Sequence, residues 1–252
     1  MPNIYESDRL LSEYLLFHYG DPSDILPYEF GPFGALDFPK RCVDLIREFV
    51  SEGDITNALD LGCAVGRSSF ELARFCRRVL GVDFSKGFIE AANNLKAKGE
   101  LKFQKRLEGD LSQPSIAKVP EGIDRKRVEF AQGDACNLPI NLGTFQVALL
   151  ANLIDRLPSP TKCLDDIANF LSPGGVMVIT SPYTWMEQFA PKKEWLGGYT
   201  KNGKSVVSLA GLQDSLQGHF ELLKYTDLPF LIREHERKFQ WSVAQATVWR
   251  KK

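Results

Sequence analysis

Three aspartates and a glycine loop are the residues whose types and spacing in this sequence could do chemistry. Asp60 ends a short apolar run, and Gly62 and Gly66 follow it, four residues apart. Asp83 and Asp134 end two later apolar runs. Glycine lets the backbone approach a ligand closely, and a carboxylate can accept ribose hydroxyls or hold a cationic group. These residues favour a nucleoside that carries a positive charge and no phosphate.

The residues of the loop exclude two common nucleotide-binding patterns. A phosphate-binding loop has Lys next to Ser or Thr after its last glycine, but Arg67 follows Gly66 here. A dinucleotide fold has glycine at the first, third and sixth places, and those places hold Gly62, Ala64 and Arg67. An NAD-linked oxidoreductase is therefore disfavoured. A bare turn with helix-capping acids is the alternative in which the loop binds nothing.

Strands and helices alternate along most of the chain, and their order predicts how the acids come together. The expected strands span 58–61, 78–83, 127–134, 145–152, 174–181, 220–227 and 243–250. The expected helices span 7–20, 39–50, 68–76, 86–98, 160–171 and 209–216. This alternation predicts an α/β fold with helices on both faces of a parallel sheet. Ligands of such sheets bind at the carboxyl ends of the strands. The last two strands predict an antiparallel pair at the sheet edge.

A single domain is expected for the 252 residues, a length that is ample for one core. We expect an N-terminal helical cap over residues 1–53 and a core over 54–252. A polar insert near 101–124 interrupts the alternation, and we interpret it as surface decoration.

Charge and composition restrict the partners of the protein. The net charge is −1 at pH 7, so no overall field attracts nucleic acid or an anionic membrane. No apolar run approaches the roughly 20 residues that span a bilayer, and the first residues lack the pattern of a secretory signal. The five cysteines lack metal-binding or redox spacing, and only three histidines occur. We therefore expect reduced thiols, a cytoplasmic location and no metal site.

The segment from Asp60 to Gly66 resembles the first motif of S-adenosylmethionine-dependent methyltransferases with a seven-stranded Rossmann-like sheet. That motif is an acid with glycines at the third, fifth and seventh places, and Ala64 replaces the middle glycine. The resemblance implies S-adenosylmethionine as cofactor, and a mostly parallel sheet ending in two antiparallel strands. It also implies residue roles: Gly62, Cys63, Ala64 and Gly66 at the methionine moiety, Asp83 at the ribose, Phe84 beside the adenine, Asp134 and Ala135 at the adenine amino group, and Asn152 near the sulfonium.

A narrower resemblance covers nearly the whole chain. It is carried by the segments YESDRLLSEYLLFHYG, LDLGCAVGRSSFELAR, ANLIDRLPSPTKCLDDI, TSPYTWMEQF and EHERKFQWSVAQATVWR. These segments are similar to the methyltransferase domain of ovothiol biosynthesis. That family methylates an imidazole nitrogen of 5-thiohistidine, also named 4-mercaptohistidine, to give ovothiol A. The resemblance implies the standalone form of this domain, with a separate sulfoxide synthase as functional partner.

An amino-acid acceptor needs an anion clamp, an ammonium acceptor and a wall for its ring. Asp155 and Arg156 follow the fourth strand, and Arg can grip a carboxylate in a bidentate fork. Tyr183 and Trp185 follow the fifth strand, where an aromatic wall suits an imidazole and a sulfonium. We assign Asp155 and Tyr183 to catalysis, and Arg156 and Trp185 to substrate binding. A surface ion pair and ordinary rim packing are the alternatives.

Four further side chains are candidates for substrate contact. Tyr14, His18 and Tyr19 could form a lid from the first helix, or equally be core and capping residues. His235 lies among charges before the last strand, where a histidine is more often solvated. Methyl transfer mainly needs proximity and orientation, so a strong base is not compulsory. A methyltransferase for another small metabolite and a non-catalytic cofactor-binding module are the rival interpretations.

Overall fold

The buried apolar runs of the sequence form a central sheet. The computed structural model describes residues 7–51 and 55–252. The strands of the sheet are β1 (Asn57–Leu61), β2 (Arg78–Asp83), β5 (Val128–Gln132), β6 (Phe145–Ala151), β7 (Leu171–Ser181), β10 (Phe220–His235) and β11 (Lys238–Lys251). Their order is β10-β11-β7-β6-β1-β2-β5. The parallel part of the sheet consists of β1, β2, β5, β6 and β7, and β11 pairs antiparallel with both β7 and β10. The expected seven-stranded, mostly parallel sheet with an antiparallel C-terminal pair is confirmed.

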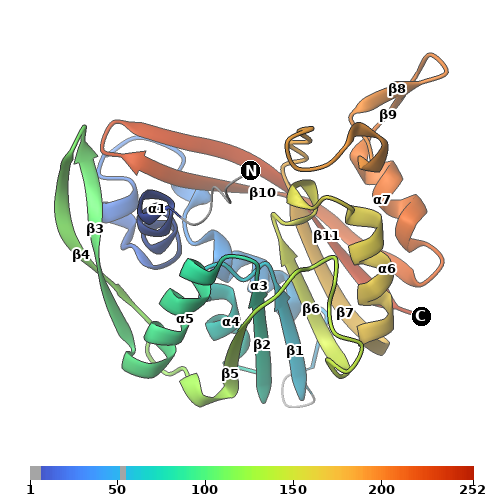
Figure 1. Ribbon diagram of the computed structural model, residues 1–252, viewed down its shortest axis with the longest axis horizontal. Coiled ribbons are helices and arrows are strands. Elements are labelled where there is room, and N and C mark those ends of the chain that lie inside the picture. Colours follow the sequence, from blue (N-terminus) through green and yellow to red (C-terminus); the bar gives the residue numbers. More distant parts are fainter. Residues whose placement is uncertain (1–6, 52–54) are drawn as a thin grey trace.

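Each face of the sheet carries its own apolar core. In β6, Val147 and Leu149 belong to one core, whereas Ala148 and Leu150 belong to the other. The split follows from the alternation of side chains along a strand. The helices of the first core are α1 (Asp8–Tyr19), α3 (Phe38–Arg47), α4 (Arg67–Leu72) and α5 (Lys86–Lys98), and those of the second are α6 (Pro160–Phe170) and α7 (Ser208–Leu216) (Figure 1).

Helix α1 starts and ends where its capping residues predict. The Ser7 hydroxyl accepts a hydrogen bond from the backbone N–H of Leu10 at 3.3 Å, and Gly20 follows the last helical residue. The Phe17 ring of α1 lies 6.0 Å from that of Phe38 and 6.2 Å from that of Phe230. Helix α1 therefore shares the core of the sheet and the C-terminal strands. Residues 1–6 and 52–54 of the expected helical cap lie outside the described residues.

The insert near residues 101–124 is more than the surface decoration we expected. It forms a hairpin of β3 (Glu100–Glu108) and β4 (Leu111–Lys118), which we call the insert hairpin. Phe103 and Ala117 of this hairpin are buried in the first core. The many charged residues of the segment hid these two apolar positions, and Gly109, with φ 51°, makes the tight turn.

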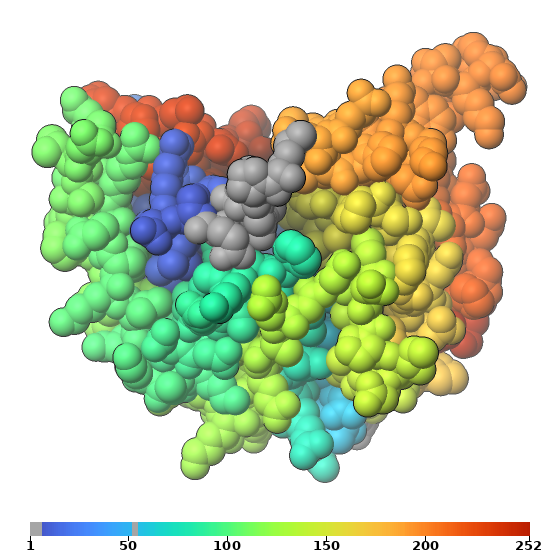
Figure 2. Space-filling view, viewed as in Figure 1, coloured from blue at the N-terminus to red at the C-terminus, as the bar shows by residue number. Residues whose placement is uncertain are grey.

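The C-terminal strands are much longer than predicted. Strands β10 and β11 extend beyond the sheet as a hairpin, and its tip is tied to the insert hairpin by a hydrogen bond of 3.1 Å from Glu236 N–H to the Leu107 carbonyl. Figure 2 shows α1 (blue) between the insert hairpin (green) and the C-terminal hairpin (red). Pro229 and the charges near the tip interrupt the apolar alternation that indicates a strand. Strand β10 tolerates that proline because it is the edge strand.

A second small hairpin also escaped the sequence-based prediction. It consists of β8 (Tyr199–Lys201) and β9 (Lys204–Val206).

All five cysteines are buried and unpaired. Within residues 7–51 and 55–252, no helix has the length and apolar character needed to cross a membrane.

Candidate cofactor and active site

The glycine loop, residues 62–66, leads from β1 into α4 through three left-handed backbone positions. Their φ angles are 77° at Gly62, 47° at Ala64 and 87° at Gly66. A Cβ atom on Gly62 would lie 2.9 Å from Leu153, and one on Gly66 would lie 2.5 Å from Phe130. Both glycines are therefore required by close packing as well as by conformation. Ala64 has a left-handed conformation that costs an L-residue roughly 1–2 kcal/mol.

Asp83 holds this loop from the end of β2. Its two carboxylate oxygens accept hydrogen bonds from the backbone N–H groups of Ala64 and Ser85, each at 2.9 Å. Each carboxylate oxygen has two lone pairs, so the same group can also accept hydroxyl donors of a ribose. Phe84, the next residue, is 63% exposed. It presents an aromatic ring on which a nucleobase could stack.

Asp60 is a buried carboxyl group with one oxygen left over. Its Oδ2 accepts a hydrogen bond of 2.6 Å from the Ser69 hydroxyl, while Oδ1 has no partner among the described residues. Burial raises the pKa of Asp60 to about 7, and the charge of Asp83 adds to the rise. An unsatisfied buried acceptor is costly, and a cationic group would relieve that cost. These carboxylate acceptors thus fit the ammonium and the ribose hydroxyls of S-adenosylmethionine, which donate hydrogen bonds.

Asp134 follows Gly133, whose backbone links the end of β5 to the end of β2. The Gly133 N–H donates to the Asp83 carbonyl at 2.9 Å. The Asp134 side chain accepts from the Cys136 N–H at 2.8 Å, and Ala135 between them is buried. The predicted adenine-edge residues therefore form a tight turn next to the predicted ribose site.

Asn152 and Tyr183, at the ends of β6 and β7, have left-handed backbones with φ angles of 51° and 53°. Asn152 Oδ1 accepts from the Thr180 hydroxyl at 3.0 Å, and the Tyr183 hydroxyl donates to Gln245 Oε1 at 3.0 Å. Strained backbone of this kind clusters at functional sites. Burial raises the pKa of Tyr183 to about 12, so its hydroxyl stays protonated at neutral pH. Gln245, on β11, carried no signal in the sequence.

Asp155 and Arg156 contact different parts of the molecule. Asp155 is fully buried, and its Oδ2 accepts from the Thr184 N–H at 2.9 Å. Its Oδ1 has no partner among the described residues, and burial raises its pKa. The Arg156 guanidinium lies 4.7 Å from the centre of the Phe189 ring. Asp155 therefore positions the segment after β7, and the role of Arg156 as an anion clamp stays a prediction.

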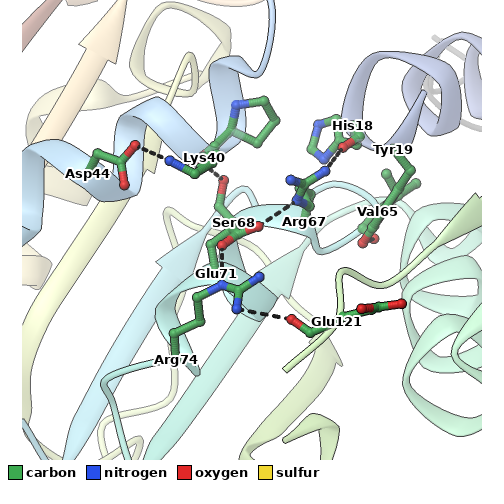
Figure 3. Close-up of polar contacts among 11 residues, drawn as sticks. His18, Tyr19, Lys40, Asp44, Val65, Arg67, Ser68, Glu71, Arg74 and Glu121 are labelled. Atoms are coloured by element: carbon green, nitrogen blue, oxygen red, sulfur yellow. Dashed lines mark hydrogen bonds and ion pairs between the residues drawn. The ribbon is translucent and has the colours of Figure 1, made fainter. Parts of the chain in front are cut away.

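Helix α1 is fastened to the glycine loop by its last two residues. The Tyr19 hydroxyl donates to the Val65 carbonyl at 2.8 Å, and Arg67 donates to the His18 carbonyl at 2.8 Å (Figure 3). A second bond of 3.0 Å joins Arg67 to Glu71. Burial, together with the charge of Arg67, lowers the pKa of His18 to about 3, so the ring is neutral. Tyr19, through its hydroxyl, and His18, through its carbonyl, hold the glycine loop and the start of α4. The hypothesis of a lid over the substrate did not predict this role.

Tyr14 and Trp185 are half-buried and packed against neighbouring elements. The Tyr14 ring lies 4.8 Å from the Phe88 ring of α5. The Trp185 indole donates to the Ser208 hydroxyl at 2.8 Å. Their proposed contact with substrate stays a prediction.

His235 lies away from the other candidate residues. It ends β10 beside Lys238, and its Nδ1 accepts from the backbone N–H of Arg237 at the hairpin tip. The β11 residues from Lys238 to Gln245 span about 23 Å at 3.3 Å per residue. The structure therefore does not bring His235 to Tyr183 and its partner Gln245. This place agrees with the solvated histidine that the charged neighbours of His235 favoured, and its contact with substrate stays a prediction.

Comparisons with known proteins agree with this geometry. The family model described as "Methyltransferase domain" matches residues 59–179. A demethylmenaquinone methyltransferase from Clavibacter sepedonicus is 31% identical over 121 residues, covering 48% of this chain and 39% of that protein. A norajmaline N-methyltransferase from Rauvolfia serpentina is 28% identical over 126 residues, covering 50% of this chain and 35% of that protein. The matched parts thus span less than half of these relatives' own length.

Solved structures share the fold over most of the chain. The N-methyltransferase NodS from Bradyrhizobium japonicum WM9, in complex with S-adenosyl-L-homocysteine, has a TM-score of 0.54 and 16% identity, covering 96% of this chain and 98% of that one. The [4+2]-cyclase SpnF has a TM-score of 0.54 and 18% identity, covering 84% and 81%. At these identities the likeness is one of fold. The family match therefore relates residues 59–179, a little under half of the chain, to a methyltransferase domain whose cofactor is S-adenosylmethionine, and the solved structures show that the rest of the chain completes the same fold.

Proposed function

We propose that the protein transfers the methyl group of S-adenosylmethionine to a nucleophilic atom of a small molecule. The observation that carries this proposal is the glycine loop, held by Asp83, together with the Asp60 carboxyl oxygen that has no partner among the described residues. The ends of β6 and β7 add the constrained residues Asn152 and Tyr183. These groups would supply contacts for a cationic nucleoside and for an acceptor at the ends of β6 and β7.

The residues of the chain would contribute orientation rather than acid–base chemistry. The bound cofactor supplies an activated methyl group, and in-line displacement then depends on how the acceptor is aligned. The Tyr183 hydroxyl is protonated at neutral pH and is held by Gln245, so it can position an acceptor but cannot take its proton. Asp155 is buried and holds the Thr184 backbone. An acceptor that already carries a lone pair therefore suits this site, and the catalytic role of Asp155 stays a prediction.

For the acceptor we propose 5-thiohistidine, methylated on the ring nitrogen adjacent to the side-chain-bearing carbon. Support comes from the similarity of five segments to the methyltransferase domain of ovothiol biosynthesis. A neutral imidazole already has a lone pair on one nitrogen, which suits a site without a strong base. A separate cytoplasmic sulfoxide synthase would supply this substrate. Relatives named for norajmaline and demethylmenaquinone keep another small metabolite open as the alternative acceptor.

Mass spectrometry with S-adenosylmethionine that carries a deuterated methyl group tests both levels of the proposal. The acceptors are 5-thiohistidine and plain histidine, and fragmentation of the product locates the label. We expect the label on the ring nitrogen. A pocket that pairs the sulfur should turn histidine over about 100-fold less efficiently in kcat/KM, a difference of roughly 2.7 kcal/mol.

Three other outcomes would contradict parts of this proposal. Label on sulfur, or equal turnover of histidine, refutes the specific acceptor and leaves the broader methyltransferase function. Binding of S-adenosylhomocysteine without turnover of any thiol, amine or imidazole would favour a module that does not transfer methyl groups. That control is needed because a [4+2]-cyclase shares the fold, and the fold alone does not fix a reaction.

A further inference from the structure

A cavity of about 370 Å³ lies outside the candidate cofactor site. Its walls come from α1, from the insert hairpin and from the outer part of β10, all of which meet at one end of the molecule (Figure 1). Residues from each wall include Arg9, Ser12, Lys105, Arg106, Arg233 and Glu234. No residue of the glycine loop lines it. The volume is within the range of small-molecule sites.

Helix α1 separates this cavity from the candidate cofactor site. Its cavity-lining residues include Arg9, Ser12 and Leu16, which recur at the spacing of a single helix face. Tyr14 and His18 lie on the opposite face, and the Tyr14 ring contacts Phe88 of α5. A ligand in the cavity would therefore bind on the far side of α1.

Arg233 is a buried cation that forms no ion pair with a described residue, and the carboxylates of Glu236 and Asp24 offset its charge only in part. It is 3% exposed, and it lines the cavity. One guanidinium nitrogen donates to the backbone carbonyl of Asp24, while Nε has no partner among residues 7–51 and 55–252. No ion pair joins Arg233 to another described residue. A buried charge without a close ion-pair partner is unfavourable, so an anion in the cavity would complete the interactions of this guanidinium.

The other buried charges around the cavity do have partners. Glu13 accepts from Arg9 at 2.8 Å, and Lys105 forms an ion pair with the side chain of Asp24. Asp24 gives Arg233 a direct hydrogen bond through its carbonyl oxygen, whereas its carboxylate oxygen Oδ1 is bound to Lys105. This contrast identifies Arg233 as the group in the wall that a ligand would satisfy.

We propose that this cavity binds a small carboxylate of the amino-acid kind, whose anionic group meets the guanidinium of Arg233. A guanidinium matches a carboxylate in planar, bidentate geometry. The wall also contains acids, among them Asp8 and Asp110. They would repel a doubly charged phosphate but would suit an ammonium group on the same ligand. Arg106, whose Nε donates to the Gly109 carbonyl, supplies a second cation.

Calorimetric titration of the full chain tests this site directly. The probes are L-glutamate and L-histidine, and each is compared with its amide, in which the α-carboxylate is replaced by a neutral group. We expect at least one carboxylate to bind with a Kd of about 1 mM or lower, and its amide to bind at least about tenfold more weakly. If no carboxylate binds more tightly than its amide, the proposal is wrong.

Two variants locate the bound carboxylate. Arg233→Gln removes the cation, and Ser12→Phe fills the cavity from the half-buried Ser12 position on α1. Both should weaken carboxylate binding by about tenfold or more, while S-adenosylhomocysteine binding shows that each variant is folded. Arg237→Gln, at the exposed hairpin tip, is the matched loss of charge and should leave binding unchanged. Carboxylate binding that persists in both cavity variants would overturn the assignment, even if Arg233→Gln alone were poorly folded.

Discussion

Replacing Asp83 by alanine is the sharpest test of where the cofactor binds. The substitution removes the acceptor of the Ala64 and Ser85 N–H groups, both at 2.9 Å, together with the proposed contacts to the ribose. Hydrogen bonds to a charged group contribute roughly 1.5–3 kcal/mol each. Partial hydration of the half-buried site reduces the sum for two ribose bonds to about 2–4 kcal/mol. Titration with S-adenosylhomocysteine should therefore show a Kd raised roughly 30- to 700-fold.

Two further variants separate the ribose contact from loop folding. Asp83→Asn keeps the shape but turns an amide donor toward one of the two N–H groups, so we expect an intermediate loss of affinity. Glu90→Ala removes an acid from an exposed pair with Lys86 on α5, and it should change affinity by less than about 0.5 kcal/mol. If Asp83→Ala is folded and binds S-adenosylhomocysteine as tightly as the unaltered protein, the nucleoside does not lie at the end of β2.

Five other substitutions, at four positions, probe the rest of the site. Ala64→Gly should be tolerated, whereas Ala64→Leu should fill the loop and abolish S-adenosylhomocysteine binding by calorimetry; normal affinity in the leucine variant would place the cofactor elsewhere. Tyr19→Phe leaves the buried Val65 carbonyl without its donor and should lower the free energy of unfolding in urea by about 1 kcal/mol, a loss that a solvated hydroxyl would not cause. Tyr183→Phe should lower kcat without shifting the pH–rate profile, whereas loss of an ionisation from that profile would show that the hydroxyl exchanges a proton. Because burial raises the pKa of Asp60 to about 7, folding favours its protonated form, so this group stabilises the fold least above pH 7. The difference in unfolding free energy between the protein and Asp60→Asn should therefore shift in favour of the variant from pH 4 to pH 8, and a constant difference would contradict the raised pKa.

The sequence predicted the central sheet because each of its buried strands is a short apolar run with a clear end. The run from Ala58 to Leu61 and the alternating units that follow leave few other arrangements. The outer hairpins were missed or shortened for the opposite reason. In the insert hairpin, only the side chains of Phe103 and Ala117 are buried apolar groups among many charged neighbours. Two such positions are too few to show the alternation of apolar and polar residues that indicates a strand.

The sequence predicted the positions of site residues where these follow from the order of strands and loops alone. Asp83 ends a strand next to the glycine loop, so its contact with Ala64 follows from the order of the elements. Gln245 could not be found in this way, because its contact with Tyr183 depends on the register between β11 and β7. His235 likewise lies where the turn of the C-terminal hairpin places it. The sequence did not predict this turn because the residues around it are charged.

Four buried polar atoms lack a partner among the described residues, and their positions connect the two sites. They are His18 Nδ1, Asp60 Oδ1, Asp155 Oδ1 and Arg233 Nε. Folding usually satisfies such groups, so a residue that remains unsatisfied indicates where binding completes the structure. Asp60 lies under the glycine loop, Asp155 holds the segment after β7, and His18 is on the helix that fastens this loop through Tyr19 and Arg67. Arg233 lies across the same helix, in the wall of the cavity. Because α1 contacts both regions, a ligand on either side would restrain one shared element, and any effect of one ligand on the affinity of the other must be reciprocal.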